Sequence, residues 1–150
     1  VLMEKRNFTQ EQFKIFHPGG QIGTNLLKVG DIMHPQDELP FIQGSTSFSE
    51  VILIISQKRL GCALVVDGNH YLRGIITDGD IRRHINNDFS RLSAEEVMTT
   101  SGTVISKEVL ASQALHLMNQ KTITVLPVVE DKQVIGLIHI HDILKRGIGE

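Results

Sequence analysis

The sequence predicts a mixed α/β fold, of the α+β type, built from two β-α-β-β-α repeats that pack with pseudo-twofold symmetry. The first observation is internal repetition, because residues 48–80 align without gaps with residues 110–142. The second is that each copy alternates segments of helical periodicity with segments rich in β-branched residues. A period above about 50 residues that occurs only twice indicates a duplicated domain rather than a solenoid.

Each copy is predicted to contain the same five elements in the same order. A short strand is followed by a helix, whose apolar residues recur at spacings of three and four, then by a β-hairpin and a final helix. In the first copy we expect these elements at 39–42, 48–58, 62–66, 72–77 and from Asp80 onward. In the second copy we expect them at 103–105, 109–120, 124–129, 134–139 and from Asp142 onward. Each half has roughly 55–60 residues and is marginal alone, so the halves should pack together.

Local signals refine this prediction. Asp67-Gly68 is a strong hairpin-turn signal, and Pro127 predicts that its strand lies at a sheet edge. Thr9 and Gln12 have the spacing of a capping box and predict a helix start. The glycine-rich stretch 17–23 is predicted to be a loop, either a flexible connector or a loop from another domain whose His17 faces a substrate.

Composition restricts the possible partners and compartments. The 150 residues carry a net charge of -2 with mixed signs, which favours neither nucleic acid nor an anionic membrane as partner. No apolar run is long enough to span a bilayer and no signal peptide is present, so we expect a cytoplasmic protein. The single Cys62 is interpreted as a buried structural thiol rather than a nucleophile, because no histidine or lysine adjoins it. The chain begins at Val1, and we expect a fragment of a longer protein.

Thr77 and Asp80 form the first candidate ligand site. Their spacing is that of a capping box, and a helix start offers free N–H groups to an anion. Arg82 and Arg83 follow and either contact a phosphate or form a solvated helix face. Capping alone is the alternative explanation for Thr77 and Asp80, and it contributes about 1 kcal/mol.

The second copy carries an altered version of this stretch. Asp142 keeps the acid, whereas His139 stands where the first copy has threonine. An acid without its capping partner is less easily explained by capping, although the helix dipole also favours an acid there. His139, His141 and Asp142 raise the alternative of a metal site. Alternate positions at a strand end converge poorly, so we expect no metal.

The two copies together resemble a CBS-domain pair, also called a Bateman module. Each copy ends in Gly-h-h-x-x-x-Asp-h (h, an apolar residue) and is preceded by acidic-h-Met, at Asp31-Ile32-Met33 and Glu96-Val97-Met98. The match is close at 74–80 and departs from the family at His139. The resemblance implies a remnant of a preceding domain at 1–28 and repeats at 29–88 and 89–150. It also implies a non-catalytic regulator that binds nucleotides in clefts between the halves and pairs into homodimers.

A narrower resemblance is to the C-terminal half of the D-arabinose-5-phosphate isomerases. It is carried by the motifs at 17–23, 77–83 and 141–144. That family joins an N-terminal sugar-isomerase (SIS) domain to a CBS pair. It converts ribulose 5-phosphate to arabinose 5-phosphate for Kdo in lipopolysaccharide or capsule. The resemblance implies an aldose-ketose isomerase as parent, with a tetramer as an alternative to the dimer, and this fragment as non-catalytic. It makes His17 the counterpart of an active-site histidine and the loop 17–23 the link to the SIS domain.

A nucleotide needs three kinds of partner. A carboxylate suits the ribose diol, helix N–H groups with a hydroxyl and cations suit the phosphate, and first-strand residues suit the base. The candidate residues are Thr77, Asp80, Arg82, Arg83, Ile42, Val104, His139 and Asp142. The pathway implied by the resemblance favours CMP-Kdo or CMP, with an adenosine nucleotide or a ligand-free structural module as alternatives. Of the two sites, we expect the one built by 74–83 to bind if only one does.

Overall fold

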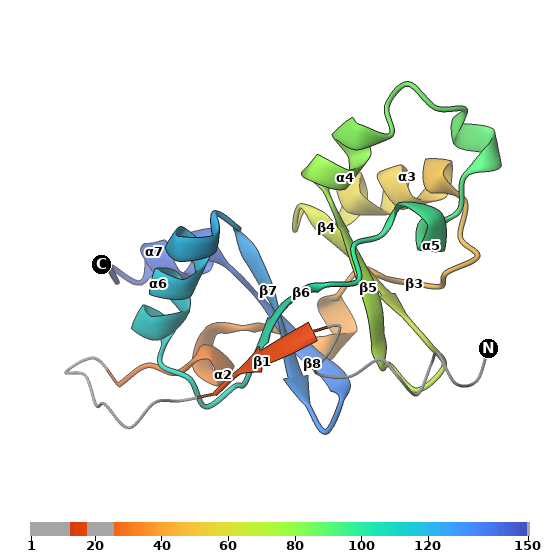
Figure 1. Ribbon diagram of the computed structural model, residues 1–150. Coiled ribbons are helices and arrows are strands. Elements are labelled where there is room, and N and C mark those ends of the chain that lie inside the picture. Colours follow the sequence, from red (N-terminus) through yellow and green to blue (C-terminus); the bar gives the residue numbers. More distant parts are fainter. Residues whose placement is uncertain (1–12, 18–25, 150) are drawn as a thin grey trace. The chain divides into compact units, whose positions relative to one another are not determined.

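The computed structural model describes residues 13–17 and 26–149, which form two compact units with one sheet each (Figure 1). The first unit contains residues 38–102 together with Phe13. The second contains 103–149 together with the described residues between 14 and 37. The opening segment of the first sequence copy therefore belongs to the second unit.

The first unit is built on a three-stranded sheet in the order β3-β4-β5. β3 and β4 are parallel, whereas β4 and β5 form an antiparallel hairpin. The strands are β3 (Phe41–Ile42), β4 (Cys62–Val66) and β5 (Leu72–Thr77). The helices are α3 (Phe48–Lys58), α4 (Asp78–Arg83), α5 (Ala94–Val97) and the 3-10 turn η2 (Phe89–Arg91). The core of this unit consists of Ile42, Phe48, Val51, Ile55, Ala63, Val65, Ile76, Ala94 and Val97.

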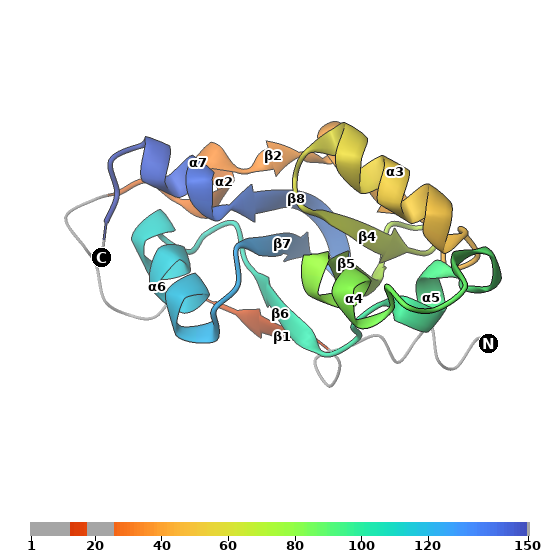
Figure 2. The same ribbon diagram turned by 90° about the horizontal axis from the view of Figure 1, so that it is seen from above.

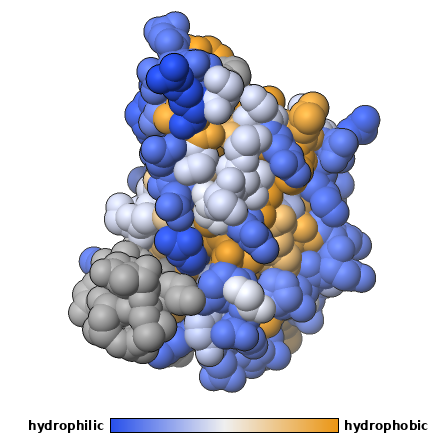
Figure 3. Space-filling view, turned by 90° about the vertical axis from the view of Figure 1, so that its right-hand side faces the viewer, coloured by the Kyte–Doolittle hydropathy of each residue, from blue (hydrophilic) through white to orange (hydrophobic). Residues whose placement is uncertain are grey.

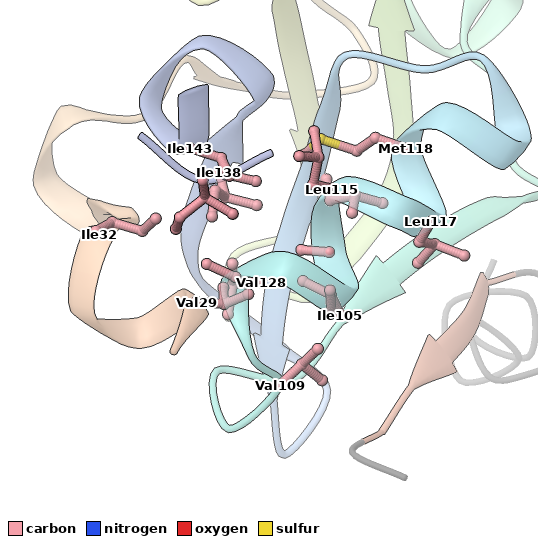
Figure 4. Close-up of a cluster of buried hydrophobic side chains, with 14 residues drawn as sticks. Val29, Ile32, Ile105, Val109, Leu115, Leu117, Met118, Val128, Ile138 and Ile143 are labelled. Carbon is pink, nitrogen blue, oxygen red and sulfur yellow. The ribbon is translucent and has the colours of Figure 1, made fainter. Parts of the chain in front are cut away.

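The second unit has a five-stranded sheet in the order β1-β6-β7-β8-β2. Figure 2 shows β2 alongside β8, with which it pairs antiparallel. The strands are β1 (Phe13–Phe16), β2 (His34–Pro35), β6 (Gly102–Ile105), β7 (Val125–Glu130) and β8 (Gln133–His139). The helices are α2 (Val29–Ile32), α6 (Ala111–Lys121), α7 (Ile140–Lys145) and the 3-10 turn η1 (Gln36–Glu38). Buried residues from α2, α6, α7 and the sheet meet in one core (Figure 4), which includes Val29, Ile105, Met118, Val128, Ile138 and Ile143.

The long helices of the two copies end in the same way, and each begins with one of the two reciprocal bonds of a capping box. The Ser47 hydroxyl accepts the amide of Glu50 at 3.3 Å at the start of α3, and the Gln113 side chain accepts the amide of Leu110 at 3.2 Å at the start of α6. At their C-terminal ends, Arg59 and Thr122 adopt the left-handed conformation that breaks a helix. The predicted helices and hairpins are therefore confirmed, with shifts of a residue or two at their ends.

Each unit is completed by the acidic-h-Met segment that opens the other sequence copy. These segments form the one-turn helices α2 and α5. The acid closes the turn, because Asp31 accepts the backbone amide of Lys28 and Glu96 that of Ser93, both at 2.8 Å. The apolar residue that follows the acid is buried in each case.

The methionine of each segment lies against a glycine of the hairpin. A Cβ placed on Gly136 would lie 2.4 Å from the sulfur of Met33, and one on Gly74 would lie 2.4 Å from the sulfur of Met98. Real Cβ atoms do not approach a neighbour so closely, so any larger residue would displace the methionine. Both glycines of the repeated motif thus make room for a methionine from the other copy.

The position of Pro127 contradicts the prediction of an edge strand. β7, which carries this proline, lies between β6 and β8 in the five-stranded sheet. A single residue pair, Ile105–Val128, links β7 to β6 in the described sheet. The ladder on that side therefore needs few N–H donors, and a residue without one is tolerated.

The predicted helix start at residues 9–12 lies outside the described residues. The residues that directly follow it, Phe13–Phe16, form strand β1 instead of continuing a helix. Strand β1 lies at the edge of the five-stranded sheet, next to β6.

The described surface is mixed in character. Figure 3 shows one face, on which hydrophilic side chains predominate and hydrophobic ones surface in small patches. The large hydrophobic residues that are most exposed are Leu26, Leu53, Ile85 and Leu144. None of the helices within the described ranges has the length and apolar character needed to cross a membrane.

Replacing Gly136 with alanine should lower the free energy of unfolding by about 1–3 kcal/mol, the usual range for overpacking. The new methyl group would meet Met33 and also the carbonyl oxygen of His34, at 2.9 Å, which is part of the backbone and cannot swing aside. Urea denaturation measures the change. Gly68→Ala is the control, because a Cβ there meets nothing within 4 Å. Equal effects of the two substitutions would contradict the proposed role of the glycine.

Candidate functional site

Asp80 lies at the third position of α4, and its carboxylate faces inward. Thr77 ends β5 and serves as the N-cap of α4. One carboxylate oxygen of Asp80 accepts the backbone amide of Thr77 at 2.9 Å and its hydroxyl at 3.3 Å. The predicted capping box is confirmed, and it fully engages this oxygen.

The second carboxylate oxygen of Asp80 is also engaged. The hydroxyl of Thr99 donates to it at 2.7 Å, and the guanidinium of Arg83 donates to it as well. The side chain of Asp80 is only 2% exposed, whereas that of Arg83 is 63% exposed. A ligand hydroxyl that approaches Asp80 must therefore displace an internal donor, and the exposed Arg83 is the easiest to move.

Asp142 occupies the corresponding position of α7 and has a more open carboxylate. One oxygen lies 2.7 Å from Nε2 of His34, and the other lies 3.8 Å from the ammonium of Lys145. The side chain of Asp142 is 20% exposed, ten times the fraction for Asp80. The oxygen near Lys145 retains capacity to accept a hydrogen bond from a ligand.

His139 does cap α7, in a different way from Thr77. Its Nδ1 atom accepts the backbone amide of His141 at 3.0 Å, and the two rings lie 4.8 Å apart. The expectation that Asp142 lacks a capping partner nearby was therefore incomplete, because the histidine takes over the cap itself. The acid is thereby released to pair with His34.

Partial burial and then the charge of His141 lower the pKa of His139 from its ordinary 6.5, and Asp142 opposes this effect. The direction agrees with the geometry, because only a neutral imidazole has a free Nδ1 lone pair to accept the amide of His141. The neutral form of His139 is thus the form that caps the helix.

Thr99 and His34 are the site residues that the sequence prediction missed. Each follows the methionine of an acidic-h-Met segment, at Met98-Thr99 and Met33-His34. Each is held opposite its acid by antiparallel pairing, Thr99 with Ile75 and His34 with Leu137. The sequence does contain an indication of these residues, since the position one residue after each methionine carries a side-chain hydrogen-bond donor.

The other predicted residues are more dispersed. Ile42 and Val104 have buried side chains, so the exposed surface near the first strand comes from Phe41, whose ring lies 4.7 Å from that of His70. Arg82 is exposed on α4, and His17 is exposed directly after β1. The side chain of Ile42 is thus shielded from solvent, and His17 is not among the described partners of either acid.

Cys62 is buried, as predicted. Burial, followed by the charge of Asp78, raises the pKa of its thiol to about 12. Such a thiol is unreactive at neutral pH. Across 13–17 and 26–149, no group of three or more histidine, cysteine or acidic side chains is placed to hold a metal ion.

One hollow of about 280 Å³ lies beside α6. It is lined by Phe16, Ser112, Gln113, His116, Leu117 and Gln120. None of the predicted ligand-binding residues contributes to it. The hollow is thus separate from the two acidic sites.

Comparison with protein families matches the CBS domain twice, at residues 29–87 and 94–149. Among curated proteins, the chain is 49% identical to the uncharacterized protein RP505 of Rickettsia prowazekii over 148 residues. It is 39% identical to the arabinose 5-phosphate isomerase KdsD of Escherichia coli K12 over 151 residues. Each match covers 99% of this chain and 46% of the relative, so the chain spans about half the length of these proteins.

Solved structures share the fold. CBSX2 from Arabidopsis thaliana, in complex with AMP, gives a TM-score of 0.73 at 24% identity and covers 81% of this chain and 96% of that one. The CBS domain pair of protein MJ0100, in complex with 5′-methylthioadenosine and S-adenosyl-L-methionine, gives 0.73 at 23% identity and covers 82% and 97%. The predicted α+β fold of paired repeats is thereby confirmed.

The cap made by His139 should weaken in acid. Because the pKa of His139 is lower in the folded protein, His139 takes up its proton at a higher pH in the unfolded chain. The contribution of the cap to stability is therefore complete above about pH 6.5 and falls as the pH drops below that value. We expect thermal melting to show that wild type loses stability relative to His139→Thr between about pH 7.5 and pH 5.5, by up to about 1 kcal/mol, the value of one cap. Threonine restores the residue of the first copy and does not titrate. A difference in stability between wild type and His139→Thr that stays constant with pH would rule out this role for His139.

Proposed function

This chain belongs to the CBS-domain family, and from that premise we propose that it is the ligand-sensing module of a D-arabinose-5-phosphate isomerase. The observation that carries the proposal is the repeated acid at a helix start, Asp80 in one unit and Asp142 in the other. A carboxylate in this position accepts the two hydroxyls of a ribose, while helix N–H groups lie close by for a phosphate. The bound nucleotide would regulate the enzyme to which the module is joined.

We place Asp142 ahead of Asp80 as the acid that binds the ligand. Its carboxylate keeps an accessible oxygen, whereas both oxygens of Asp80 already accept internal hydrogen bonds. We therefore propose the order opposite to the one expected from the sequence, in which the site at 74–83 was favoured. Binding at Asp80 requires Arg83 to swing out, and the freed guanidinium, together with Arg82, would then be available for a phosphate.

The choice of nucleotide rests on the neighbours and the relatives. Similar CBS structures were solved in complex with AMP or with 5′-methylthioadenosine and S-adenosyl-L-methionine, which favours an adenosine ligand. The similarity to arabinose 5-phosphate isomerases favours CMP-Kdo or CMP, as end-product control of Kdo synthesis would require. We place the adenosine nucleotide first, because its support comes from molecules bound to the same fold.

The proposed partner is an SIS isomerase domain that precedes the module, with residues 1–28 as its closing segment and linker. The chain accounts for 46% of the length of the isomerase relatives, which leaves room for such a domain in proteins of their size. The parent would act in the cytoplasm as a homodimer or tetramer assembled through its CBS pairs. His17 would then belong to the isomerase site and would have no catalytic role within the module.

A ligand-free assembly module is the second candidate. The full internal satisfaction of Asp80 supports it, because a carboxylate with four donors needs no ligand to stabilise it. In that case the two acids would serve as helix caps and as anchors for Thr99 and His34.

Thermal melting of the chain with AMP, ATP, CMP and CMP-Kdo separates these candidates. A ligand at 100 times its dissociation constant should add about 2.7 kcal/mol to the stability of the folded state. We expect AMP to give the largest shift and Asp142→Asn to reduce it most, with Asp80→Asn reducing it less. Asparagine is chosen because it keeps the shape of the buried acid.

Asp131→Asn is the matched control. Asp131 lies in the exposed turn between β7 and β8 at a positive φ of 51°, which asparagine adopts readily. This substitution removes one negative charge, as Asp142→Asn does, at a residue outside both sites, so the shift in melting temperature caused by AMP should persist. If no nucleotide shifts the melting temperature, the assembly module is favoured. If cytidine compounds act and adenosine compounds do not, the adenosine assignment is wrong.

A further inference from the structure

The segment that enters the module is attached to the second unit by backbone hydrogen bonds. The amide of Ala111 donates to the carbonyl of Leu27 at 2.8 Å, and the amide of Val29 donates to that of Val109 at 2.8 Å. The amide of Gly30 donates to Lys107 at 2.9 Å. These bonds hold residues 27–30 against the turn that leads into α6.

The same segment continues directly to the second acidic site. Residues His34 and Pro35 form β2 and pair with Leu137 and Gly136 of β8. The side chain of His34 then reaches Asp142 at 2.7 Å. The acid at the start of α7 is thus one hydrogen bond away from the chain that leads into the module.

The first acidic site has different connections. The described partners of the Asp80 carboxylate are Thr77, Arg83 and Thr99, all of which belong to the first unit. Thr99 occupies the position equivalent to His34, but the chain continues from it into β6, the first strand of the second copy. Equivalent contacts therefore attach the two acids to different parts of the chain.

We infer that the second site, through the Asp142–His34 hydrogen bond, is the site that communicates with the entering segment 27–35, and that His34 is the positioning residue for this coupling. A ligand hydroxyl that donates to the Asp142 oxygen near Lys145 draws on the negative charge of the carboxylate whose other oxygen contacts the His34 imidazole. It therefore changes the strength of the bond that holds His34 and β2. Because coupling is reciprocal, a change imposed on the entering segment would alter ligand affinity at Asp142 by the same factor. The ligand arm of this inference rests on the proposed function, whereas the link itself does not.

The ligand-free link is tested by hydrogen exchange on the whole chain, with mass spectrometry as the readout. Loss of one hydrogen bond in His34→Ala should speed exchange at the amides of Val29, Gly30 and Met33 by roughly 2- to 12-fold. These amides are donors in the native state. Thr99→Ala removes the equivalent bond in the first unit and should leave them unchanged.

His34→Gln provides the rescue, because its amide retains an N–H donor at the site without an imidazole. Exchange in segment 27–35 should return toward the wild-type rate, which loss of packing alone would not allow. The inference is overturned if Thr99→Ala speeds exchange in this segment as much as His34→Ala does. It is equally overturned if neither substitution affects it.

AMP serves as the probe for the ligand arm. Saturating AMP should change exchange in segment 27–35 in wild type and in Thr99→Ala, and should leave it unchanged in His34→Ala. AMP that raises the melting temperature without affecting this segment in wild type overturns the coupling while preserving the proposed function. If AMP gives no melting shift, the proposed adenosine ligand fails, and the ligand-free comparison of His34→Ala with Thr99→Ala still decides the link.

Discussion

The contact of one methionine with one glycine is the constraint on which the rest of this molecule depends. Met33 and Met98 each pack against a strand of a hairpin at a glycine, where the strand carries no side chain. Each methionine comes from the opening segment of the opposite sequence copy. Each copy therefore supplies a segment to the unit built mainly by the other copy, and neither repeat contains all the parts of one unit.

The same constraint explains why the two acidic sites differ in chemistry while sharing a scaffold. Seating the methionine places the next residue against the hairpin and opposite the acid at the helix start. In one unit that residue is a hydroxyl donor, Thr99, and in the other it is an imidazole, His34. The residue at this position differs between the two units, and with it the partner of the acid and the part of the chain that the acid contacts. Duplication has thus produced two frameworks of the same design with unequal sites.

The helices and hairpins could be predicted from the sequence because their signals are local. The spacing of apolar residues located α3, and the Asp67-Gly68 turn located the hairpin of β4 and β5. The exchange of opening segments could not be predicted, because it depends on contacts such as Met33 with Gly136 that no local pattern reveals. The candidate acids were found from their capping spacing. Their partners were missed, since Thr99 lies 19 positions from Asp80 and His34 lies 108 positions from Asp142.

The pairing of β2 with β8 has a consequence for the order in which the chain is made. The first unit has all its strands and its closing methionine once synthesis has passed Thr99. His34 and Pro35, by contrast, must wait for Leu137 and Gly136 near the far end of the chain. Because domains fold as they emerge from the ribosome, the earliest part of the module is among the last to find its place. A strand left waiting in this way is an unpaired edge, and its hydrophilic flank at Gln36-Asp37-Glu38 would help to keep it from pairing with another nascent chain.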